Sequence, residues 1–356
     1  MTSIIELKDV TKRFGDVRAV DDVSLDVTEG EFLAVLGPSG AGKTTILRMI
    51  AGFETPTDGR ILLDGQDITN SPPHNRETAT VFQNYALFPH LTVRENIEFG
   101  LKRNGFSGDE IGPKIKEVLE KVDLPGYEER KPANLSGGQQ QRVATARALA
   151  IEPKVLLMDE PLGALDKKLR DQLEVEIIEL QEELGITTLY VTHNQEEALT
   201  MADRVAVMND GAIEQISSPT EIYNKPETDF VANFIGDANA LTDNAEIEDE
   251  LRLEQNPETA AEGTPQDVNP YVRPEKMRLE GPEYTGPEVT IPGTVNQTIF
   301  TGSTTTYYVS AMGDELMVEQ QNESAGSEVE FEPGDTVTLV WDQQDMTLVK
   351  AKEGGH

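Results

Sequence analysis

The chain has no cysteine and no long apolar run among its 356 residues. The lack of cysteine excludes disulfides and thiol chemistry, and it is typical of proteins that work in a reducing interior. A membrane-spanning helix needs about 20 consecutive apolar residues, so any role at a membrane should be peripheral. The N-terminal segment MTSIIELKDV alternates apolar and polar residues, and we expect it to form a strand rather than a secretory signal.

Basic residues are also scarce. The chain contains 30 Lys and Arg against 65 Asp and Glu, for a formal net charge of −35. Residues 241–356 hold 24 of the acidic and 6 of the basic residues. Such a surface repels nucleic acid and also itself, unless salt near 1 M shortens the Debye length to about 3 Å. We therefore expect a halophilic source. Disorder is the alternative, but 37% hydrophobic residues can support a core.

The length predicts two domains, which we place at residues 1–236 and 237–356. In the first domain, four short aliphatic segments should be strands of one mixed sheet: IIELKDV, RAVDDVSLDV, EFLAVLG and GRILLDGQDI. Apolar residues at helical spacing predict a helix that ends at Gly52. They also predict the helices RENIEFGLKR and PKIKEVLEKVDL, within a helical insert at about 84–152.

Strand-like and helix-like segments alternate from residue 155 to about 216, and this alternation predicts a parallel α/β sheet. The expected elements are the strand VLLM, the long helix KKLRDQLEVEIIELQEELG, the strand TTLYVTH, the helix QEEALTMAD and the hairpin RVAVMNDGAIEQI. Residues 254–270 predict a long surface loop. The later runs VTIPGTVNQTIF, TTTYYVSAM, ELMVEQQ, DTVTLVWD and MTLVKAK predict a small β-barrel or sandwich.

The string GPSGAGKTT, at residues 37–45, fits the pattern G-x-x-x-x-G-K-[ST]. In that pattern, backbone N–H groups curl around phosphates at the N-terminus of a helix. Lys43 should neutralise the β and γ phosphates of ATP, and the Thr44 hydroxyl should ligate Mg²⁺. A glycine-rich turn without a ligand is the alternative, which the strand-to-helix context disfavours. The predicted nucleotide-binding residues are Gly37, Pro38, Ser39, Gly40, Ala41, Gly42, Lys43, Thr44 and Thr45.

The string VLLMDEP, at residues 155–161, predicts a buried strand that ends in two carboxylates. Ligands bind at the carboxyl ends of strands in α/β sheets. Neighbouring residues of a strand point to opposite sides, so the two carboxylates should have different roles. Asp159 should hold Mg²⁺, and Glu160 should polarise the attacking water. An acidic turn without a catalytic role is the alternative.

These two strings, with LSGGQQQR at residues 135–142, resemble the ATP-binding subunits of ABC transporters over residues 1 to about 235. The resemblance implies a P-loop α/β ATPase that works as a homodimer. It implies that the signature residues face the γ-phosphate bound by the other subunit, with the positive end of a helix dipole aimed at it. These residues are Ser136, Gly137, Gly138 and Gln139. A Ser-capped helix without that role is the alternative.

The same resemblance implies roles for four single residues. Gln83 matches the Q-loop glutamine, which contacts Mg²⁺, and Asp166 matches the D-loop aspartate. His193 matches the switch histidine beside the catalytic Glu160. Phe14 falls where the family stacks an aromatic ring, more usually Tyr, on adenine. The alternative for His193 is a structural histidine, and for Phe14 a core phenylalanine.

Residues from about 240 onward resemble the OB-like β domain found on ATPases of certain importers, with YVRPEKMRL at 271–279 as the matching segment. The resemblance implies a regulatory or dimerisation domain and an ATPase peripheral to the cytoplasmic side of the cell membrane. It implies two transmembrane permease subunits and, indirectly, an extracytoplasmic solute-binding protein. YALFPHLTV, beside Gln83, could receive a permease helix or could pack within the insert.

The substrate class follows only from the resemblance. The segment from PPHNRETATVFQ onward, with TLVWD, is most similar to importers of spermidine and putrescine, while iron(III), thiamine, molybdate, sulfate and sugars remain alternatives. A soluble ABC ATPase that acts on nucleic acid or ribosomes is disfavoured, because the chain has a single ATPase unit and no basic face. A regulator without turnover would need a damaged catalytic set, and the set is complete.

Overall fold

A computed structural model describes residues 2–163, 165–241, 268–322 and 330–350 of the chain. The chain divides into two compact units, residues 1–219 and residues 220–356. Among the described residues, no helix combines the length and apolarity needed to cross a bilayer. Most of the loop predicted at 254–270 lies outside the described residues.

The first unit contains a four-stranded antiparallel sheet with the strand order β2-β1-β4-β5. Its strands are β1 (Ser3–Phe14), β2 (Val17–Thr28), β4 (Asp58–Leu63) and β5 (Gln66–Asp67). The long strands β1 and β2 form a hairpin whose turn follows Phe14. Several exposed residues on β1 and β2 fit a sheet with one face on the core and the other toward water.

A second sheet of six strands has the order β10-β9-β3-β8-β7-β6. All neighbours in it are parallel except the hairpin of β9 and β10. Its strands are β3 (Phe32–Leu36), β6 (Thr78–Val81), β7 (Val155–Asp159), β8 (Thr187–Thr192), β9 (Arg204–Asn209) and β10 (Ala212–Ser217). The prediction of one mixed sheet for the four N-terminal segments is therefore wrong. Every residue of β3 is buried, which requires cover on both faces and favours the centre of a parallel sheet.

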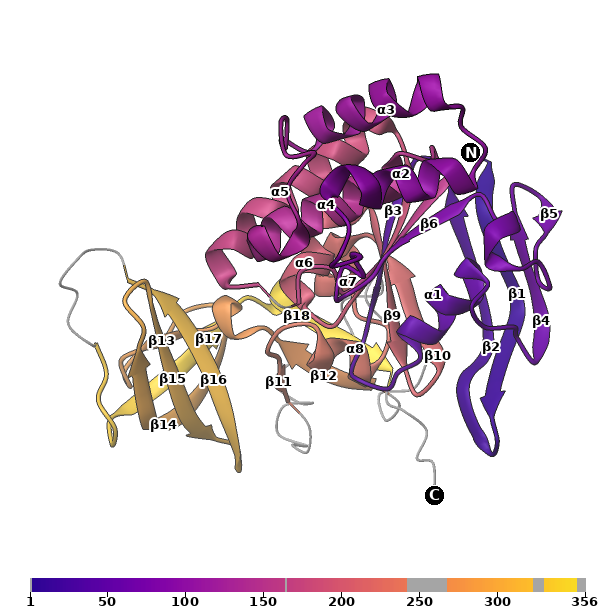
Figure 1. Ribbon diagram of the computed structural model, residues 1–356. Coiled ribbons are helices and arrows are strands. Elements are labelled where there is room, and N and C mark those ends of the chain that lie inside the picture. The colour runs from indigo at the N-terminus through magenta and orange to yellow at the C-terminus, as the bar shows by residue number, and fades with distance from the viewer. Residues whose placement is uncertain (1, 164, 242–267, 323–329, 351–356) are drawn as a thin grey trace. The chain divides into compact units, whose positions relative to one another are not determined.

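The helix α1 (Lys43–Ala51) lies between the two sheets in Figure 1. Its residues Ile46 and Ile50 share one core cluster with Ile5 of β1 and Leu189 of β8. Longer helices lie on the other side of the six-stranded sheet (Figure 1), where Ala144 and Leu173 share a core cluster with Phe32 and Tyr190 of the sheet. The remaining helices of this unit are α2 (Val93–Arg103), α3 (Gly108–Lys121), α4 (Gly137–Leu149), α5 (Lys167–Leu184) and α6 (Gln195–Met201), with short 3₁₀ turns at Pro73–Asn75 and Pro132–Asn134.

The predicted helical insert is present as α2, α3 and α4, and its first two helices begin with capping boxes. The sequence PKIKEVLEKVDL predicted a helix from Pro113, but α3 begins five residues earlier. Ser107 and Glu110 form the capping box that starts it, and Pro113 lies inside the helix. A Ser-x-x-Glu pattern was therefore a better marker of the start than proline.

The second unit joins two antiparallel sheets, with the orders β11-β12-β18 and β13-β17-β14-β15-β16. Their strands are β11 (Asn239–Ala240), β12 (Val268–Val272), β13 (Arg278–Glu280), β14 (Val289–Phe300), β15 (Thr304–Ala311), β16 (Asp314–Gln321), β17 (Thr336–Trp341) and β18 (Met346–Lys350), with 3₁₀ turns at Pro274–Lys276 and Gln343–Asp345. Residues of both sheets, among them Val272, Tyr307 and Trp341, share one core. The predicted small β domain is confirmed.

Two short helices that the sequence did not predict precede these strands, α7 (Pro219–Asn224) and α8 (Asp229–Phe234). Arg273 fixes both helices to the β domain, because its guanidinium donates hydrogen bonds of 3.0 Å to the carbonyl oxygens of Tyr223 and Ala232. Arg273 is the first residue of the Arg-Pro-Glu segment. These bonds explain why the compact unit begins near residue 220, before the domain boundary that we place at 236.

Candidate nucleotide-binding site

The carboxyl ends of four parallel strands meet at one edge of the six-stranded sheet. In the register of the sheet, Leu36 pairs with Thr192 and Asp159 pairs with Val191. Val81, the last residue of β6, pairs with Met158. The loops that follow these strands carry residues 37–45, Gln83, Glu160 and His193, so the sheet brings together motifs that lie far apart in the sequence.

Residues 37–42 form a tight loop between β3 and α1. Gly42 has a φ of 101°, and a Cβ there would lie 2.3 Å from the carbonyl oxygen of Ala19. At Gly37 a Cβ would lie 2.3 Å from the carbonyl oxygen of Met208, so only glycine fits either position. In the described part of the chain, no side chain caps the first turn of α1. The backbone N–H groups of that turn can therefore donate to an anion.

The ammonium of Lys43 folds back onto this loop. Its Nζ donates to the carbonyl oxygens of Gly37 and Pro38, over 2.7 and 2.9 Å, and the residue is only 5% exposed. Burial lowers the pKa of Lys43, while the nearby carboxylates of Glu160 and Asp159 act in the opposite direction. The positive charge thus lies between the phosphate loop and the two carboxylates at the end of β7.

Asp159 ends β7 and faces α1. The hydroxyl of Thr44 donates to its Oδ1 over 3.0 Å, a contact between residues 115 positions apart. Burial raises the pKa of the Asp159 carboxyl, and the charge of Glu160 adds to this effect, while the bond from Thr44 acts against it. The contact puts a hydroxyl oxygen and a carboxylate side by side, which is the oxygen-rich chemistry that Mg²⁺ prefers.

Glu160 faces two side chains from other loops. The Nε2 amide of Gln83 donates to its Oε2 over 3.1 Å, and Nδ1 of His193 lies 3.2 Å from the same oxygen. The backbone of Glu160 has a φ of 45°, a left-handed conformation that is uncommon for this residue type. Its amide N–H is held by the carbonyl of Val191 over 2.9 Å. This turn directs Asp159 and Glu160 to different partners: Thr44 for Asp159, and Gln83 and His193 for Glu160.

The signature segment caps α4. Ser136 and Gln139 form a capping box, in which the Ser136 side chain accepts from the N–H of Gln139 over 3.3 Å and the Gln139 Oε1 accepts from the N–H of Ser136 over 3.0 Å. Gly137 and Gly138 begin the helix between them. Within the described chain, no hydrogen bond or ion pair joins residues 136–139 to the phosphate loop.

Asp166 and Phe14 lie at the ends of secondary-structure elements. Asp166 is the N-cap of α5, and its Oδ1 accepts from the N–H of Leu169 over 3.1 Å. Phe14 ends β1 and is 48% exposed, with Nζ of Lys12 at 4.8 Å from the centre of its ring. The exposure shows that Phe14 is not a core residue, which was the alternative to an adenine-stacking role.

A buried network behind His193 was missed by the sequence reasoning. Glu197, only 3% exposed, accepts hydrogen bonds from the hydroxyls of Tyr190 and Thr192 over 2.9 and 2.7 Å. Arg170 lies 3.7 Å from the other oxygen of Glu197 and donates to the carbonyl of Leu165, next to Asp166. Burial raises the pKa of Tyr190 well above its ordinary value, so its hydroxyl remains a donor.

Side chains of α2 and α4 fix the loop after Gln83 through hydrogen bonds to its backbone. Tyr85 and Ala86 both have positive φ, at 60° and 47°. The guanidinium of Arg147 donates to the carbonyl oxygens of both residues, over 2.9 and 2.7 Å. Asn96, fully buried, exchanges hydrogen bonds with the backbone of Phe88. Single polar residues inside helices gave no sequence signal for these roles.

An apolar groove of about 510 Å³ lies beside this loop. Phenylalanines line much of it, and two of them, Phe53 and Phe99, are about half exposed. The ring of Phe88 contacts that of Phe99, with 5.0 Å between their centres. YALFPHLTV thus packs partly within the insert and partly lines an open apolar surface.

Comparison with known families gives two matches. Residues 20–163 match the ABC transporter family, and residues 271–349 match the TOBE domain. A dimeric ATP-binding cassette solved in a post-hydrolysis state with ADP and Pi is 36% identical to this chain. Its TM-score is 0.54, over 60% of this chain and 98% of that chain. The cbiO1 protein of Clostridium perfringens, part of the transporter complex cbiONQ, is 29% identical, with a TM-score of 0.58 over 62% of this chain and 91% of that chain.

Curated relatives cover almost the whole chain. The spermidine/putrescine import ATP-binding protein PotA of Rubrobacter xylanophilus is 48% identical, over 98% of this chain and 94% of the relative. PotA proteins of Acidothermus cellulolyticus and Thermobifida fusca are each 49% identical, over 95% of this chain and 91% of their own lengths. The motifs converge on one sheet edge, and the similarity extends through the TOBE domain. The chain therefore belongs to the family of ATP-binding subunits of ABC transporters, within the group that carries a C-terminal TOBE domain.

Proposed function

We propose that this chain is the ATP-hydrolysing subunit of an importer for polyamines of the spermidine and putrescine type. The observation that best supports ATP hydrolysis is the position of Glu160, whose carboxylate contacts both Gln83 and His193 beside the phosphate loop. The polyamine class rests on the names of relatives that are 45–49% identical over nearly the whole chain. Iron(III), thiamine, molybdate, sulfate or sugar transport would use the same ATPase.

ATP binds with its phosphates in the loop of residues 37–45. The N–H groups of the loop and of the first turn of α1 donate to the phosphate oxygens. Lys43 leaves the carbonyls of Gly37 and Pro38 and neutralises the β and γ phosphates. Exposed Phe14 stacks on the adenine, a contact worth about 1–3 kcal/mol.

The oxygens of Thr44, Gln83 and Asp159 fit an Mg²⁺ ion that accompanies ATP. The fit rests on the Thr44–Asp159 contact and on the absence of any cationic side chain between them in the described chain. Bound Mg²⁺ neutralises phosphate charge. The raised pKa of Asp159 is consistent with this, because a buried carboxylate gains most from a nearby cation.

Glu160 is the general base. Its carboxylate takes a proton from water while the water oxygen bonds to the γ-phosphorus and the bond to the ADP oxygen breaks. Gln83 orients the carboxylate through Oε2, and His193 approaches the same oxygen and senses the γ-phosphate. The left-handed turn at Glu160 holds the carboxylate away from Asp159, so base and metal ligand stay separate.

Two copies of the chain complete the site. Residues 136–139 present the N-terminus of α4, whose partial positive charge favours a γ-phosphate held by the phosphate loop of the second copy. Asp166 lies next to that interface. One copy alone therefore binds ATP and hydrolyses it slowly. The dimeric cassette that this chain resembles supports this arrangement.

The membrane partners are two permease subunits, and the apolar groove beside Gln83 receives a helix from one of them. Its half-exposed phenylalanines suit an interface core. The ATPase is peripheral, on the cytoplasmic side, and a solute-binding protein delivers the polyamine on the other side.

Residues 1–236 serve as the ATPase domain, and residues 237–356 have a regulatory or dimerisation role. The net charge of −35 supports a halophilic source.

The test is reconstitution of the chain with the permease subunits encoded beside it and their solute-binding protein. ATP-dependent uptake of labelled putrescine or spermidine into vesicles is expected, and Glu160→Gln should abolish it. Uptake of ferric iron, molybdate or a sugar instead would overturn the polyamine assignment and leave the ATPase in place. Uptake that proceeds normally with Glu160→Gln would overturn the assignment of the base.

A further inference from the structure

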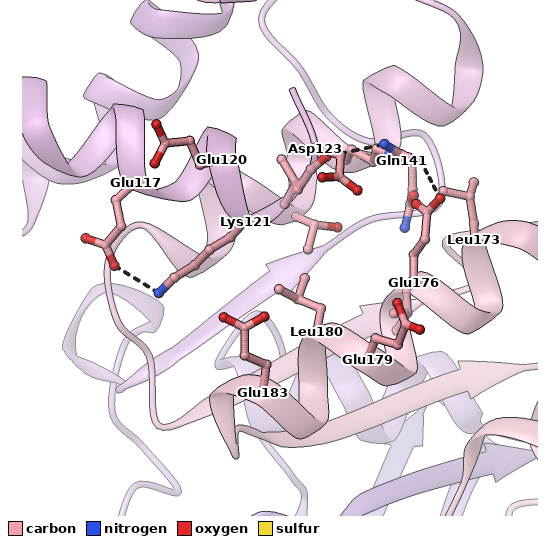
Figure 2. Close-up of a pocket in the computed structure, with 14 residues that line it drawn as sticks. Glu117, Glu120, Lys121, Asp123, Gln141, Leu173, Glu176, Glu179, Leu180 and Glu183 are labelled. Atoms are coloured by element: carbon pink, nitrogen blue, oxygen red, sulfur yellow. Dashed lines mark hydrogen bonds and ion pairs between the residues drawn. The ribbon is translucent and has the colours of Figure 1, made fainter. Parts of the chain in front are cut away.

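A second cavity, of about 440 Å³, lies between α3, α4 and α5 (Figure 2). Its lining residues differ from those of the nucleotide site. Figure 2 shows carboxylates of α3 and α5 around its opening, with Glu120 on one side and Glu179 and Glu183 on the other. Gln141 of α4 is labelled near Leu173 of α5.

The floor of this cavity contains two buried polar side chains of α4. Gln141 is 1% exposed and Thr145 is 2% exposed. Oε1 of Gln141 and Oγ1 of Thr145 have no hydrogen-bond partner among the residues that the structure describes. A buried acceptor without a partner is unfavourable, so such atoms are rare unless something binds to them. Both atoms can accept a hydrogen bond from a donor that enters the cavity.

The charge around the cavity is strongly negative. Six carboxylates line it against two cationic residues, and both cations are already paired: Lys121 with Glu117 over 2.9 Å, and Arg142 with Glu176. Three other lining carboxylates, of Asp123, Glu179 and Glu183, have no ion-pair partner in the described part of the chain. Unpaired acceptors on the floor and unpaired carboxylates at the opening both favour a ligand that carries positive charge and N–H donors.

Part of the wall is apolar. Leu173 and Ile177 are buried and Leu180 is partly buried, and all three are residues of α5 that line the cavity. A hydrated metal ion would gain nothing from these side chains. A methylene chain between two ammonium groups would cover them.

We infer that this cavity binds a linear aliphatic diamine or polyamine. One ammonium donates to Oε1 of Gln141 and Oγ1 of Thr145, the methylenes lie against Leu173 and Ile177, and a second ammonium pairs with the carboxylates at the opening. The ligand attaches to α4, the helix whose N-terminus carries the signature segment. The inference rests on the cavity alone and stands whichever solute the assembled importer carries.

The test is calorimetric titration of the nucleotide-free full chain with 1,4-diaminobutane and with spermidine, in salt that keeps the chain folded. Saturable binding of one ligand per chain is expected. Butylamine, which lacks the second ammonium, should bind at least about tenfold more weakly, as expected for the loss of a charge-assisted hydrogen bond. Equal heats for the diamine and for MgCl₂ at the same ionic strength would show charge screening only and overturn the proposal.

Variants locate the ligand in the cavity. The combined exposed changes Glu179→Gln and Glu183→Gln should weaken diamine binding at least about tenfold. The combination of Asp171→Asn and Glu182→Gln is the matched control, because it also removes two charges from exposed positions of the same helix, outside the cavity. An effect of the double variant no larger than that of the control would overturn the proposal.

Thr145→Val keeps the shape of the side chain and removes the hydroxyl on the floor. It should weaken diamine binding by about tenfold while the melting temperature of the free chain stays close to that of the wild type. If this variant does not fold, the double variant on the exposed face of α5 still decides the question. If folded Thr145→Val binds the diamine as tightly as the wild type, the proposed contact between an ammonium and the Thr145 hydroxyl is overturned.

Discussion

The side-chain amide of Gln83 donates a hydrogen bond to Oε2 of Glu160 over 3.1 Å, across 77 positions of sequence. His193 approaches the same oxygen at 3.2 Å. A carboxylate held by two polar side chains from different loops responds to movement of either loop.

Glu160→Gln should lower the rate of ATP hydrolysis by about 10²–10⁴-fold, the usual contribution of a general base. ATP binding should persist, because the amide keeps the shape of the side chain and the phosphate loop is untouched. The measurement is steady-state phosphate release together with binding of a fluorescent ATP analogue. Glu182→Gln, an exposed change on α5, is the control and should hydrolyse at the wild-type rate. Equal rates of hydrolysis for both variants would show that a residue other than Glu160 is the general base.

Asp159→Asn should stabilise the nucleotide-free chain at neutral pH. Burial raises the pKa of Asp159 above its unfolded value, so the ionised carboxylate opposes folding. The contribution of this group to stability is therefore greatest at acidic pH, and it is lost as pH rises from the unfolded pKa through the folded pKa. Thermal unfolding at several pH values checks this: the difference between variant and wild type should close as the pH falls. A variant that melts below the wild type at pH 7 would contradict it.

Glu197→Gln should slow hydrolysis and also lower the stability of the fold. Tyr190 and Thr192 both donate to Oε2 of Glu197, while the amide of Asn194 and Nε of Arg170 face Oε1. A Gln side chain that keeps its oxygen toward the two hydroxyls turns its N–H groups toward these other donors, at a cost of about 1–3 kcal/mol. Because Glu197 acts through the His193 loop, kcat should fall while the KM for ATP stays near the wild-type value. Glu196→Gln, at the exposed neighbouring position, is the control and should change neither quantity. A loss of stability with unchanged kcat would make Glu197 structural only.

Phe14→Ala should weaken ATP binding by about 1–3 kcal/mol, the value of stacking a base on an aromatic ring. Phe14→Tyr should bind as the wild type does, since stacking needs no hydroxyl. The side chain is about half exposed, so neither change should perturb the fold. Titration of the isolated chain with ATP measures both. Equal affinities for the Ala and Tyr variants would place the adenine elsewhere.

Salt should stabilise the chain strongly. A formal net charge of −35 repels itself in dilute buffer, and about 1 M salt shortens the Debye length to about 3 Å. The melting temperature should therefore rise steeply between about 0.1 and 1 M KCl. A neutral osmolyte at the same osmolality is the control and should raise it less. Full stability in dilute buffer would argue against a halophilic source.

Much of the fold could be predicted from local pattern. Gly52 and Gly185 end their helices with left-handed φ, as glycine after an apolar helical run predicts. The strand run VTIPGTVNQTIF coincides with β14, from Val289 to Phe300. These features depend on residues close together in the chain, so the sequence is enough to locate them.

Other features depended on partners far away in the chain. Whether β3 joins the N-terminal strands or the parallel sheet depends on competition between whole sheets, and the segment EFLAVLG is compatible with both. The helices α7 and α8 are only six residues long, too short for a clear periodic pattern, and bonds from Arg273 help to hold them. Short helices gain their stability from tertiary contacts rather than from propensity.

The sequence by itself determined the chemistry that we propose for the ATP site, because the phosphate loop, the carboxylates and the signature are contiguous strings whose residue types that chemistry requires. Only the tertiary structure decided which side chains meet. It joined Gln83 and His193 at one oxygen of Glu160 and buried Glu197 behind them. It also left Oε1 of Gln141 and Oγ1 of Thr145 in a cavity without a hydrogen-bond partner among the described residues. The physical reason is that hydrogen bonds and burial depend on distance in space, which the register of a parallel sheet and the packing of helices set.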